Sequence, residues 1–582
     1  MLKIISRSIR EYKRSSILAP IFVAIEVILE CIIPFVTAKL INNINNGTYN
    51  MSSLLRDAGI LVLLAAASLT CGALSGHFCA VASCGFAKNL RHDMYTKIQS
   101  FSFSNIDKFS TSSLVTRLTT DINNVQMSYM MIIRGAIRCP LMLIFAFTMA
   151  VIVGGSVSFA FAVIIPFLAI GLLLIVKNAW GIFHSVFKKY DNLNASVQEN
   201  VSGMRVVKSF VREDYEIKKF NAASDNIAAD FTKAEKIIAL NSPLMQFSIH
   251  ALMIGICLLG SRLIITTNES ALAVGDLASL ITYGIQILMS LMILSMIIVT
   301  IALSMASAKR IVEVIREEPS IKNPDAPVMK VSDGSIEFSA VSFKYSEKAE
   351  RNALEDITVS IKAGETVGII GGTGSGKSSL VGLIPRLYDV SAGSVKVGGV
   401  DVREYDIEAL RDDVAMVLQK NILFAGTIKE NIRWGDENAT DEEIVRICRL
   451  AQAEEFIEKF PDKYDTYIEQ GGANVSGGQK QRLCIARALI KKPKILILDD
   501  STSAVDTKTD ALIRRAFAEE IPNTTKIIIA QRVSSVSDAD KIIVMENGKI
   551  ESIGNHEYLL SHSPIYKEVY ESQVKGGESD EN

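Results

Sequence analysis

Six long apolar stretches in the first half of this 582-residue chain limit its possible folds more than any other feature. A helix needs about 20 apolar residues to cross the ~30 Å hydrocarbon core of a bilayer. Each stretch is long enough, and they cover residues 17–40, 58–86, 132–154, 157–180, 238–266 and 277–303. The first follows basic residues, as a secretory leader does, but its apolar run is too long and no A-x-A-like site follows it. The sequence therefore predicts an α-helical six-span transmembrane bundle.

Basic residues gather in two of the segments that join these stretches. Lys and Arg are frequent between residues 88 and 117 and again between residues 188 and 219, whereas residues 154–158 carry no charge. Loops rich in Lys and Arg stay on the cytoplasmic side. We therefore expect a multi-pass plasma-membrane protein with both termini in the cytoplasm. The two basic segments look amphipathic and are predicted to continue the membrane helices as long cytoplasmic helical extensions.

The composition changes after residue 316. Residues 317–334 contain three prolines among polar residues, which is typical of a linker. Short β-branched runs then alternate with helical segments, as in a soluble α/β domain. The predicted strands are residues 366–370, 495–498, 526–530 and 541–545. We expect a transmembrane domain at residues 1–316, an α/β domain at residues 335–574 and a polar tail at residues 575–582.

Charge and cysteine content exclude several classes of protein. The 61 Lys and Arg residues nearly balance the 63 Asp and Glu residues, so nothing in the overall charge indicates nucleic-acid binding. None of the eight cysteines forms a C-x-x-C pair, and six lie in apolar runs. Buried thiols in a reducing compartment are a better interpretation than a disulfide scaffold or a zinc site.

The segment after the first predicted strand matches the G-x-x-x-x-G-K-[ST] pattern of a phosphate-binding loop. It consists of Gly371, Gly372, Thr373, Gly374, Ser375, Gly376, Lys377 and Ser378, followed by Ser379. Glycines allow backbone N–H groups to surround phosphate oxygens, and the helix expected to follow adds positive partial charge. We expect Lys377 to reach the β- and γ-phosphates of a nucleotide and Ser378 to bind Mg²⁺.

Two further segments carry groups that suit a nucleotide site. An apolar strand ends in Asp499 and Asp500, and a buried strand would bring Asp499 to its tip, where a carboxylate can support Mg²⁺. Ser and Gly residues suited to phosphate precede the helix expected from Lys480, namely Ser476, Gly477, Gly478 and Gln479. A nucleotide site built on the first phosphate loop does not by itself account for a second loop that is suited to phosphate.

Together these motifs resemble those of ATP-binding-cassette exporter half-transporters, and the resemblance extends over nearly the whole chain. Further matching segments are residues 199–208, 307–311, 427–432 and 503–506. The resemblance implies ATP and Mg²⁺ as cofactors, a P-loop nucleotide-binding domain in the cytoplasm, and a cargo of amphiphilic drugs, lipids or peptides. In the family, two nucleotide domains close head to tail, and each ATP lies between one phosphate loop and the other subunit's signature loop.

The resemblance also implies roles for particular residues. Tyr345 matches the aromatic residue that stacks on adenine, and Gln419 matches the glutamine that contacts Mg²⁺ and the attacking water. Ser476 to Gln479 match the signature loop, with Val475 in place of the usual Leu. Residues 105–109 and 212–216 match the loops that dock onto nucleotide domains.

Two residues depart from the family pattern at the catalytic positions. Asp500 stands where the family usually has the Glu that acts as general base, and a displacement of about 1 Å can cost ~10²-fold in rate. Gln531 stands where the family has His, and Gln donates a hydrogen bond but cannot become a cation near pH 7. Either change alone fits neutral drift, whereas both together favour a degenerate site that binds ATP and turns it over slowly.

A homodimer would contain two weakened sites, so we expect a heterodimer with a second half-transporter chain that has the Glu and His. The leading interpretation is one subunit of a bacterial multidrug-type exporter, an ATP-hydrolysing translocase only as a heterodimer. The alternatives are a regulatory ATP-sensing membrane subunit and an importer component. The importer is disfavoured because the membrane half and the nucleotide half share one chain.

Several polar and sulfur-containing residues lie within the apolar stretches. Glu26 and Glu30 share one helix face, and either attract cationic amphiphiles or pair with Arg134, Arg138 or a group near the outer interface. Hydrogen bonds between helices are expected for His77, Gln246 and His250. The methionines form either an adaptable binding wall or ordinary packing; they are Met127, Met130, Met131, Met142, Met289, Met292 and Met296.

Overall fold

The structure is a computed structural model that describes residues 1–47, 50–267, 271–347, 349–500 and 505–578. The chain forms two compact units. The first consists of Met1–Ser100 and Ser110–Glu317, and the second consists of Phe101–Phe109 and the chain from Glu318 onward. The short segment Phe101–Phe109 therefore belongs with the second unit, although the sequence places it between two apolar stretches.

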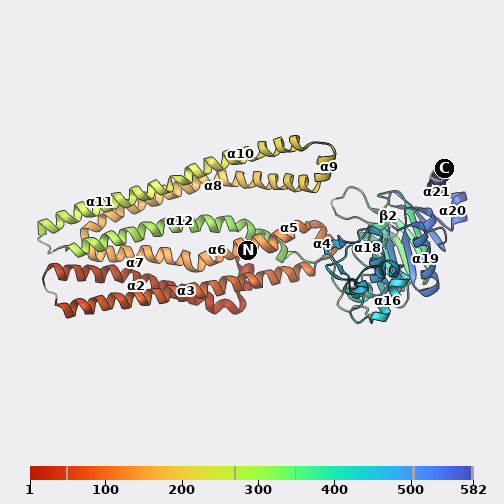
Figure 1. Cartoon of the computed structure of the whole chain (residues 1–582), viewed down its shortest axis with the longest axis horizontal. Helices are drawn as coiled ribbons and strands as arrows, with labels where there is room; N and C mark the ends of the chain where they lie inside the picture. Colours follow the sequence, from red (N-terminus) through yellow and green to blue (C-terminus); the bar gives the residue numbers. More distant parts are fainter. Residues whose placement is uncertain (48–49, 268–270, 348, 501–504, 579–582) are drawn as a thin grey trace. The chain divides into compact units, whose positions relative to one another are not determined.

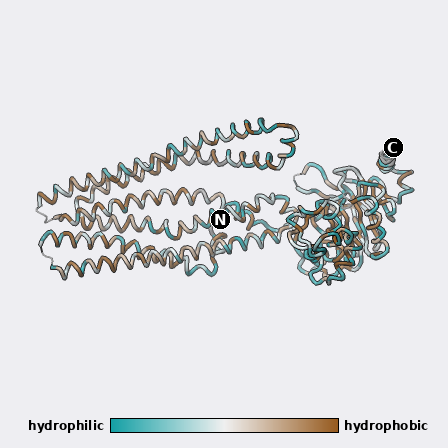
Figure 2. The backbone as a smooth tube through the Cα atoms, in the orientation of Figure 1, coloured by the Kyte–Doolittle hydropathy of each residue, from teal (hydrophilic) through white to brown (hydrophobic). Residues whose placement is uncertain are grey.

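Long helices build the first unit, and hydrophobic residues run along most of their length (Figures 1 and 2). The helices are α1 (Leu2–Ile5), α2 (Lys13–Asn45), α3 (Met51–Gln99), α5 (Thr111–Thr116), α6 (Ile122–Met130), α7 (Ala136–Gly154), α8 (Phe159–Ser202), α9 (Met204–Ser209), α10 (Glu213–Ala239), α11 (Asn241–Thr267) and α12 (Val274–Arg316). Short 3₁₀ or π segments connect some of them: η1 (Ser6–Tyr12), η2 (Arg117–Asp121), η3 (Met131–Gly135) and η4 (Gly155–Ser158). The helices α3 and α8 extend well beyond their apolar stretches and α10 precedes the fifth stretch, so the predicted helical extensions at the two basic segments are present. The helix α12 also extends beyond its stretch, which was not predicted.

Among the described residues, five helical runs are long and apolar enough to cross a membrane. They are Lys3–Asn45, Met51–Gln99, Thr111–Ala179, Glu213–Thr267 and Val274–Arg316. The third run contains two of the six apolar stretches, and Gly155 lies between them with φ of +47°, a value that L side chains rarely adopt. The structure thus has five such runs, and the six apolar stretches fall within them.

Five of the long helices share one apolar core. Its buried members include Val23 and Val27 of α2, Ala146 and Ala150 of α7, Phe161 and Leu168 of α8, Leu252 and Ile256 of α11, and Leu280 and Ile287 of α12. At its centre the buried hydroxyl of Tyr283 donates a hydrogen bond to the Cys31 carbonyl oxygen at 2.7 Å. A buried tyrosine hydroxyl needs such a partner, so this bond fixes α12 against α2.

The second unit contains one mainly parallel sheet, one antiparallel sheet and one two-stranded ribbon. The six-stranded sheet has the order β12-β11-β3-β10-β9-β6, and only β12 is antiparallel to its neighbour. Its strands are β3 (Thr366–Gly371), β6 (Val414–Val417), β9 (Ile495–Asp499), β10 (Thr525–Ile529), β11 (Lys541–Glu546) and β12 (Lys549–Gly554). The antiparallel sheet has β1 (Ile336–Phe343), β2 (Leu354–Ile361), β4 (Ala392–Val397) and β5 (Val400–Asp401), and the ribbon pairs β7 (Gly426–Thr427) with β8 (Tyr467–Ile468).

Helices surround these sheets. They are α4 (Phe103–Lys108), α13 (Lys377–Gly382), α14 (Ile407–Asp413), α15 (Ile428–Arg433), α16 (Asp441–Leu450), α17 (Glu454–Ile457), α18 (Gly477–Leu489), α19 (Thr507–Glu520), α20 (His556–His562) and α21 (Pro564–Glu578), with 3₁₀ turns at Lys463–Asp465, Gln470–Gly472 and Val533–Ser535. The four strands predicted from β-branched runs are all confirmed, as β3, β9, β10 and β11. The helix α21 includes the first four residues of the expected polar tail.

Alternate residues of the six-stranded sheet enter two separate cores. Ile495 and Ile497 of β9 belong to one buried cluster, whereas Leu496 and Leu498 belong to another. Strands covered on both faces are apolar at every position, which is why β9 reads as a continuous apolar run. Because both faces of each strand are covered, the ends of the strands have fixed positions. The polar residues that follow the strands are therefore held in fixed positions too.

Candidate nucleotide-binding site

Polar segments from four strands meet at one edge of the six-stranded sheet. The phosphate loop follows β3, Asp499 and Asp500 lie at the end of β9, Gln531 follows β10 and Gln419 follows β6. The carboxyl ends of parallel strands face the same edge, which is where open α/β sheets bind their ligands. The fold therefore brings together segments that are more than 100 residues apart in the chain.

The phosphate loop has the backbone that its glycines permit. Gly374 and Gly376 have φ of +82° and +94°, and a Cβ on Gly376 would lie 2.8 Å from the Ala353 carbonyl oxygen. The Lys377 ammonium donates to the Gly371 and Gly372 carbonyl oxygens at 2.7 and 2.8 Å. Burial lowers the pKa of Lys377, and the Asp500 and Asp499 carboxylates oppose this shift. A lysine beside a Gly-rich loop that opens a helix suits the β- and γ-phosphates of a nucleotide.

Ser378 and Asp499 form a pair of oxygen ligands next to this loop. The Ser378 hydroxyl donates a hydrogen bond to Asp499 Oδ1 at 3.0 Å. Burial raises the pKa of Asp499; the hydrogen bond from Ser378 opposes the shift and the neighbouring Asp500 adds to it. Hydroxyl and carboxylate oxygens are the ligands that Mg²⁺ prefers, so this pair fits a magnesium ion carried by a nucleotide.

Asp500 is buried and accepts hydrogen bonds from two glutamine amides. Gln531 Nε2 donates to Asp500 Oδ2 at 2.6 Å, and Gln419 Nε2 donates to the same oxygen at 3.4 Å. The backbone N–H of Asp500 donates to the Ile529 carbonyl oxygen at 3.0 Å, and its φ is +48°. The structure thus places the three residues predicted for catalysis around one carboxylate oxygen.

Two supporting glutamines were missed by the sequence analysis. Gln573 of α21 donates to the Gln531 carbonyl oxygen and accepts from the Val533 N–H, both at 2.8 Å, so it holds the backbone on both sides of Arg532. Gln481 of α18 donates to the Asp500 carbonyl oxygen at 3.4 Å. No local pattern marks Gln573, which is 42 residues from Gln531 in the chain. Gln481 lies two residues after the signature loop, in the first turns of the helix that was expected there.

A cavity of about 780 Å³ adjoins the phosphate loop. Its lining includes Tyr345, Arg351, Asn352, Asn547 and the loop residues Gly374 to Ser379. Tyr345 is 52% exposed and its hydroxyl lies 2.8 Å from Ser379 Oγ. A half-exposed ring beside a phosphate loop is suitably placed for the base of a nucleotide.

A second tyrosine connects this cavity to the short helix α4. The rings of Tyr388 and Tyr345 meet edge to face with centroids 5.2 Å apart. The Tyr388 hydroxyl donates to Asp107 Oδ2 at 2.7 Å, and its ring also packs against Phe103. Burial raises the pKa of Tyr388, and the Asp107 carboxylate raises it further. The segment expected to dock at residues 105–109 therefore contacts a neighbour of the cavity residue Tyr345.

The signature loop lies apart from the phosphate-loop cavity. Ser476 Oγ accepts from the Gln479 N–H at 3.3 Å, and Gln479 Oε1 accepts from the Ser476 N–H at 2.9 Å, so the two residues form a capping box at the start of α18. Ser476 and Gly477 are exposed, and none of the four signature residues lines the cavity. Within one chain, the structure does not bring the signature loop to the phosphate loop.

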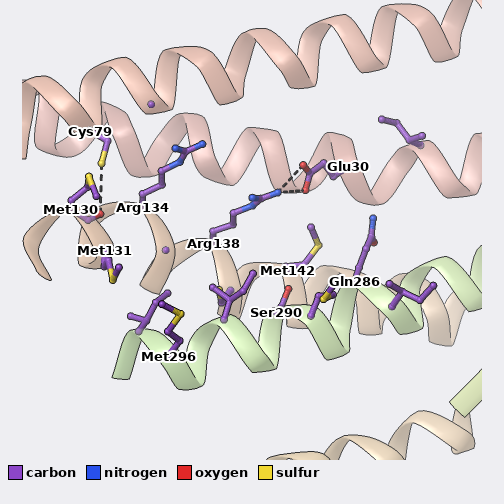
Figure 3. Close-up of a pocket in the computed structure, with 18 of the residues that line it drawn as sticks. Glu30, Cys79, Met130, Met131, Arg134, Arg138, Met142, Gln286, Ser290 and Met296 are labelled. Atoms are coloured by element: carbon purple, nitrogen blue, oxygen red, sulfur yellow. Dashed lines mark hydrogen bonds and ion pairs between the residues drawn. The ribbon is translucent and has the colours of Figure 1, made fainter. Parts of the chain in front are cut away.

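A second cavity, of about 750 Å³, lies among α2, α3, α7 and α12 of the first unit (Figure 3). Arg138 donates to both carboxylate oxygens of Glu30 at 2.7 and 2.8 Å and lies 3.7 Å from Glu26. The pairing interpretation is therefore confirmed for both glutamates with Arg138. Five of the seven methionines line this cavity, namely Met130, Met131, Met142, Met289 and Met296.

The sequence predictions also concern the cysteines, His250 and residues 503–504. All eight cysteines are free, and among the described residues no group of three His, Cys, Asp or Glu side chains could hold a metal ion. The Nδ1 atom of His250 forms a hydrogen bond with the backbone carbonyl oxygen of Gln246, in its own helix, at 2.7 Å, so the expected bond between helices is wrong for His250. Ser503 and Ala504, which belong to the segment quoted for the resemblance, lie outside the described residues.

A bundle of long apolar helices joined to an α/β unit with a phosphate loop defines a membrane protein with an ATP-binding domain. Residues 16–304 match the family model of the ABC transporter transmembrane region, and residues 354–503 match that of the ABC transporter ATP-binding domain. This chain belongs to the ABC transporter family, whose members couple ATP hydrolysis to transport.

Similar proteins cover nearly its whole length. The uncharacterized ABC transporter ATP-binding protein YfiB of Bacillus subtilis (strain 168) is 37% identical over 89% of this chain and 90% of its own. The uncharacterized ABC transporter ATP-binding protein Rv1273c of Mycobacterium tuberculosis (strain ATCC 25618 / H37Rv) is 31% identical over 98% of each chain. A solved structure of a bacterial Atm1-family ABC exporter with ATP bound shares the fold, with a TM-score of 0.82 and 24% identity over 97% of this chain and 98% of that one.

Proposed function

We propose that this chain is one subunit of an ATP-driven exporter and acts with a second, different half-transporter chain. Its first unit crosses the plasma membrane six times, with the reversal at Gly155 separating the third and fourth crossings. Both termini and the ATP-binding unit lie in the cytoplasm. Its cargo is an amphiphilic drug, lipid or peptide. The fold shared with a bacterial ABC exporter supports this direction of transport.

The chain binds ATP at the carboxyl edge of the six-stranded sheet. Tyr345 stacks on the base, the phosphate loop surrounds the phosphates and Lys377 contacts the β- and γ-phosphates. Ser378, Gln419 and Asp499 hold Mg²⁺, which neutralises phosphate charge when it is bound. Asp499 is buried and Lys377 is half-buried, so both lie where water screens charge less than in bulk solvent, and their charges act more strongly on a bound nucleotide.

The observation that carries the degenerate-site proposal is the hydrogen bond from Gln531 to Asp500. A general base must reach the attacking water with an available oxygen. The Asp500 side chain is one methylene shorter than that of Glu. Its Oδ2 oxygen, which would accept the proton, already accepts hydrogen bonds from the Gln531 and Gln419 amides. Gln531 also supplies no positive charge for the γ-phosphate, so this site binds ATP and hydrolyses it slowly.

The exposed signature loop supports a heterodimer. Its Ser and Gly residues face outward and match the loop that completes another subunit's site, where the Glu and His of the second chain carry out hydrolysis. A further contact surface lies at the turn between α9 and α10, where Phe210 and Val211 are 73% and 81% exposed and Tyr215, in the first turn of α10, is also exposed. This tip includes the region expected to dock at residues 212–216, and it suits the nucleotide domain of the second chain.

The decisive experiment compares the chain purified alone with the double variant Asp500→Glu/Gln531→His. The chain alone is expected to bind ATP but to hydrolyse it slowly, because each of its sites lacks the general base. The double variant is expected to gain at least about tenfold in ATPase rate, since it restores both groups next to an intact signature loop. Adding Lys377→Ala to the double variant should abolish the gain, which shows that the new activity comes from this site.

Rapid hydrolysis by the unaltered chain alone would overturn the degenerate-site proposal. Co-purification with a second chain, followed by uptake assays in inside-out vesicles, tests export itself. ATP-dependent closure without transport of any amphiphile would instead support the regulatory ATP-sensing subunit.

A further inference from the structure

The charged groups that line the membrane-unit cavity are unequal in number. The wall carries two guanidinium groups, Arg134 and Arg138, and one carboxylate, Glu30. Glu26 is not a lining residue and is only 7% exposed, so it lies behind the wall. The lining itself therefore presents two guanidinium groups and one carboxylate to an occupant, and Glu26 balances part of this charge from behind the wall.

The two arginines differ in what they already bind. Arg138 donates to both oxygens of Glu30 and lies 3.7 Å from Glu26, so it serves both carboxylates. Arg134 lies one helical turn earlier, and no hydrogen bond or ion pair joins it to another residue in the part of the chain that the structure describes. Figure 3 shows Arg138 directed at Glu30, while no interaction is drawn to Arg134. The Glu26 carboxylate attracts Arg134 electrostatically but does not form an ion pair with it.

An unpaired guanidinium within membrane-spanning helices is costly unless it binds an anion or water. The rest of the wall is suited to an apolar body, since it contains several isoleucines and five methionines, and methionine side chains adapt to different shapes. One polar atom on the opposite wall is also unsatisfied: Gln286 Oε1 of α12 is buried without a hydrogen-bond partner among the described residues. This oxygen can accept a hydrogen bond from an N–H or O–H group.

We propose that this cavity binds anionic amphiphiles, whose carboxylate, sulfate or phosphate group pairs with Arg134 while the apolar body lies on the methionine-rich wall. Cationic amphiphiles are disfavoured, because the carboxylates that would attract them are already held by Arg138. The inference rests on the proposed export function and specifies in addition that the substrate carries a negative charge.

The test measures equilibrium binding to the full-length protein in lipid nanodiscs, together with its second chain once that chain is identified. Three probes share one alkyl chain: dodecyl phosphate, dodecyltrimethylammonium and dodecanol. Dodecyl phosphate is expected to bind at least about tenfold more tightly than the other two, a difference that a single desolvated charge pair readily supplies. Arg134→Gln should remove this preference, and Arg134→Lys should keep most of it.

Arg262→Gln is the matched control, because Arg262 is an exposed arginine of α11 that does not line the cavity. It should leave all three affinities unchanged, and an unchanged size-exclusion profile of every variant shows that its membrane unit is folded. Tighter binding of the ammonium probe, no binding of any probe, or an unchanged preference in Arg134→Gln would each overturn the proposal. The ATPase gain of Asp500→Glu/Gln531→His needs no amphiphile, so failure of the export mechanism and failure of this charge assignment are separable.

Discussion

The phosphate-loop edge and the signature loop belong to one unit but are built in different ways. At the edge, Asp499 and Asp500 are buried and accept hydrogen bonds from Ser378, Gln531 and Gln419. At the signature loop, Ser476 and Gln479 bond each other and the neighbouring Gly477 is exposed. The groups of the edge thus bond across four segments inside the fold, whereas the loop bonds only within itself and is exposed at the surface. The contrast suggests that the changed catalytic residues weaken one site and leave the other loop fit to serve a second chain.

The largest expected effect comes from Gly477→Asp. In the proposed heterodimer this residue faces the γ-phosphate held by the second chain, where a carboxylate adds both bulk and repulsion. ATPase and transport by the heterodimer should fall by more than about tenfold, while ATP binding persists. Steady-state ATPase and nucleotide binding, measured on the co-purified pair, check this.

Asn438→Asp is the control for Gly477→Asp, since it adds the same carboxylate at an exposed turn of the same unit. It should leave turnover unchanged. Near-normal turnover in Gly477→Asp would show that the two regions do not differ in the way proposed, because the signature loop would then complete no hydrolytic site.

A smaller effect is expected from Asp500→Asn. Asn keeps the length of the side chain and one oxygen that can accept from Gln531, and the residue that it replaces has little catalytic role left to lose. Heterodimer ATPase should change by less than about threefold, whereas the same change at the matching residue of the second chain should nearly abolish it. Single-turnover hydrolysis separates the two sites, and equal losses would mean that they are equivalent.

The smallest effect is expected from Gln573→Ala, which removes both hydrogen bonds that hold the backbone around Arg532. A net hydrogen bond contributes about 1 kcal/mol, so ATP affinity at this edge should fall roughly threefold to tenfold. Gln573→Glu is the matched variant, because it keeps the acceptor for the Val533 N–H and loses the donor to Gln531. It should have an intermediate affinity, and a loss of hydrolysis at the second chain's site would contradict a role confined to this edge.

Much of the candidate site could be predicted from short sequence patterns. The phosphate loop, the acidic end of β9 and the strand before Gln531 all depend on neighbouring residues, because a buried parallel strand must be apolar and a phosphate loop must have glycine where φ is positive. The contribution of Gln573 could not be predicted, since it depends on α21 returning to β10 across 42 residues. The same holds for Tyr388, whose partner Asp107 is 281 residues away.

The sequence by itself determined the class of this protein: apolar stretches of membrane length, followed by a phosphate loop and an acidic strand end, allow few other folds. Only the tertiary structure decided which charged and polar side chains have an ion-pair or hydrogen-bond partner. It gave both Glu26 and Glu30 to Arg138 and left Arg134 at the cavity wall, although all four residues were visible as candidates in the sequence. It also placed Asp500 at φ of +48°, a region that Asp tolerates better than most residues, with its carboxylate against Gln531. Charge pairing and backbone conformation depend on distances of a few ångströms between distant segments, and only the packed fold sets those distances.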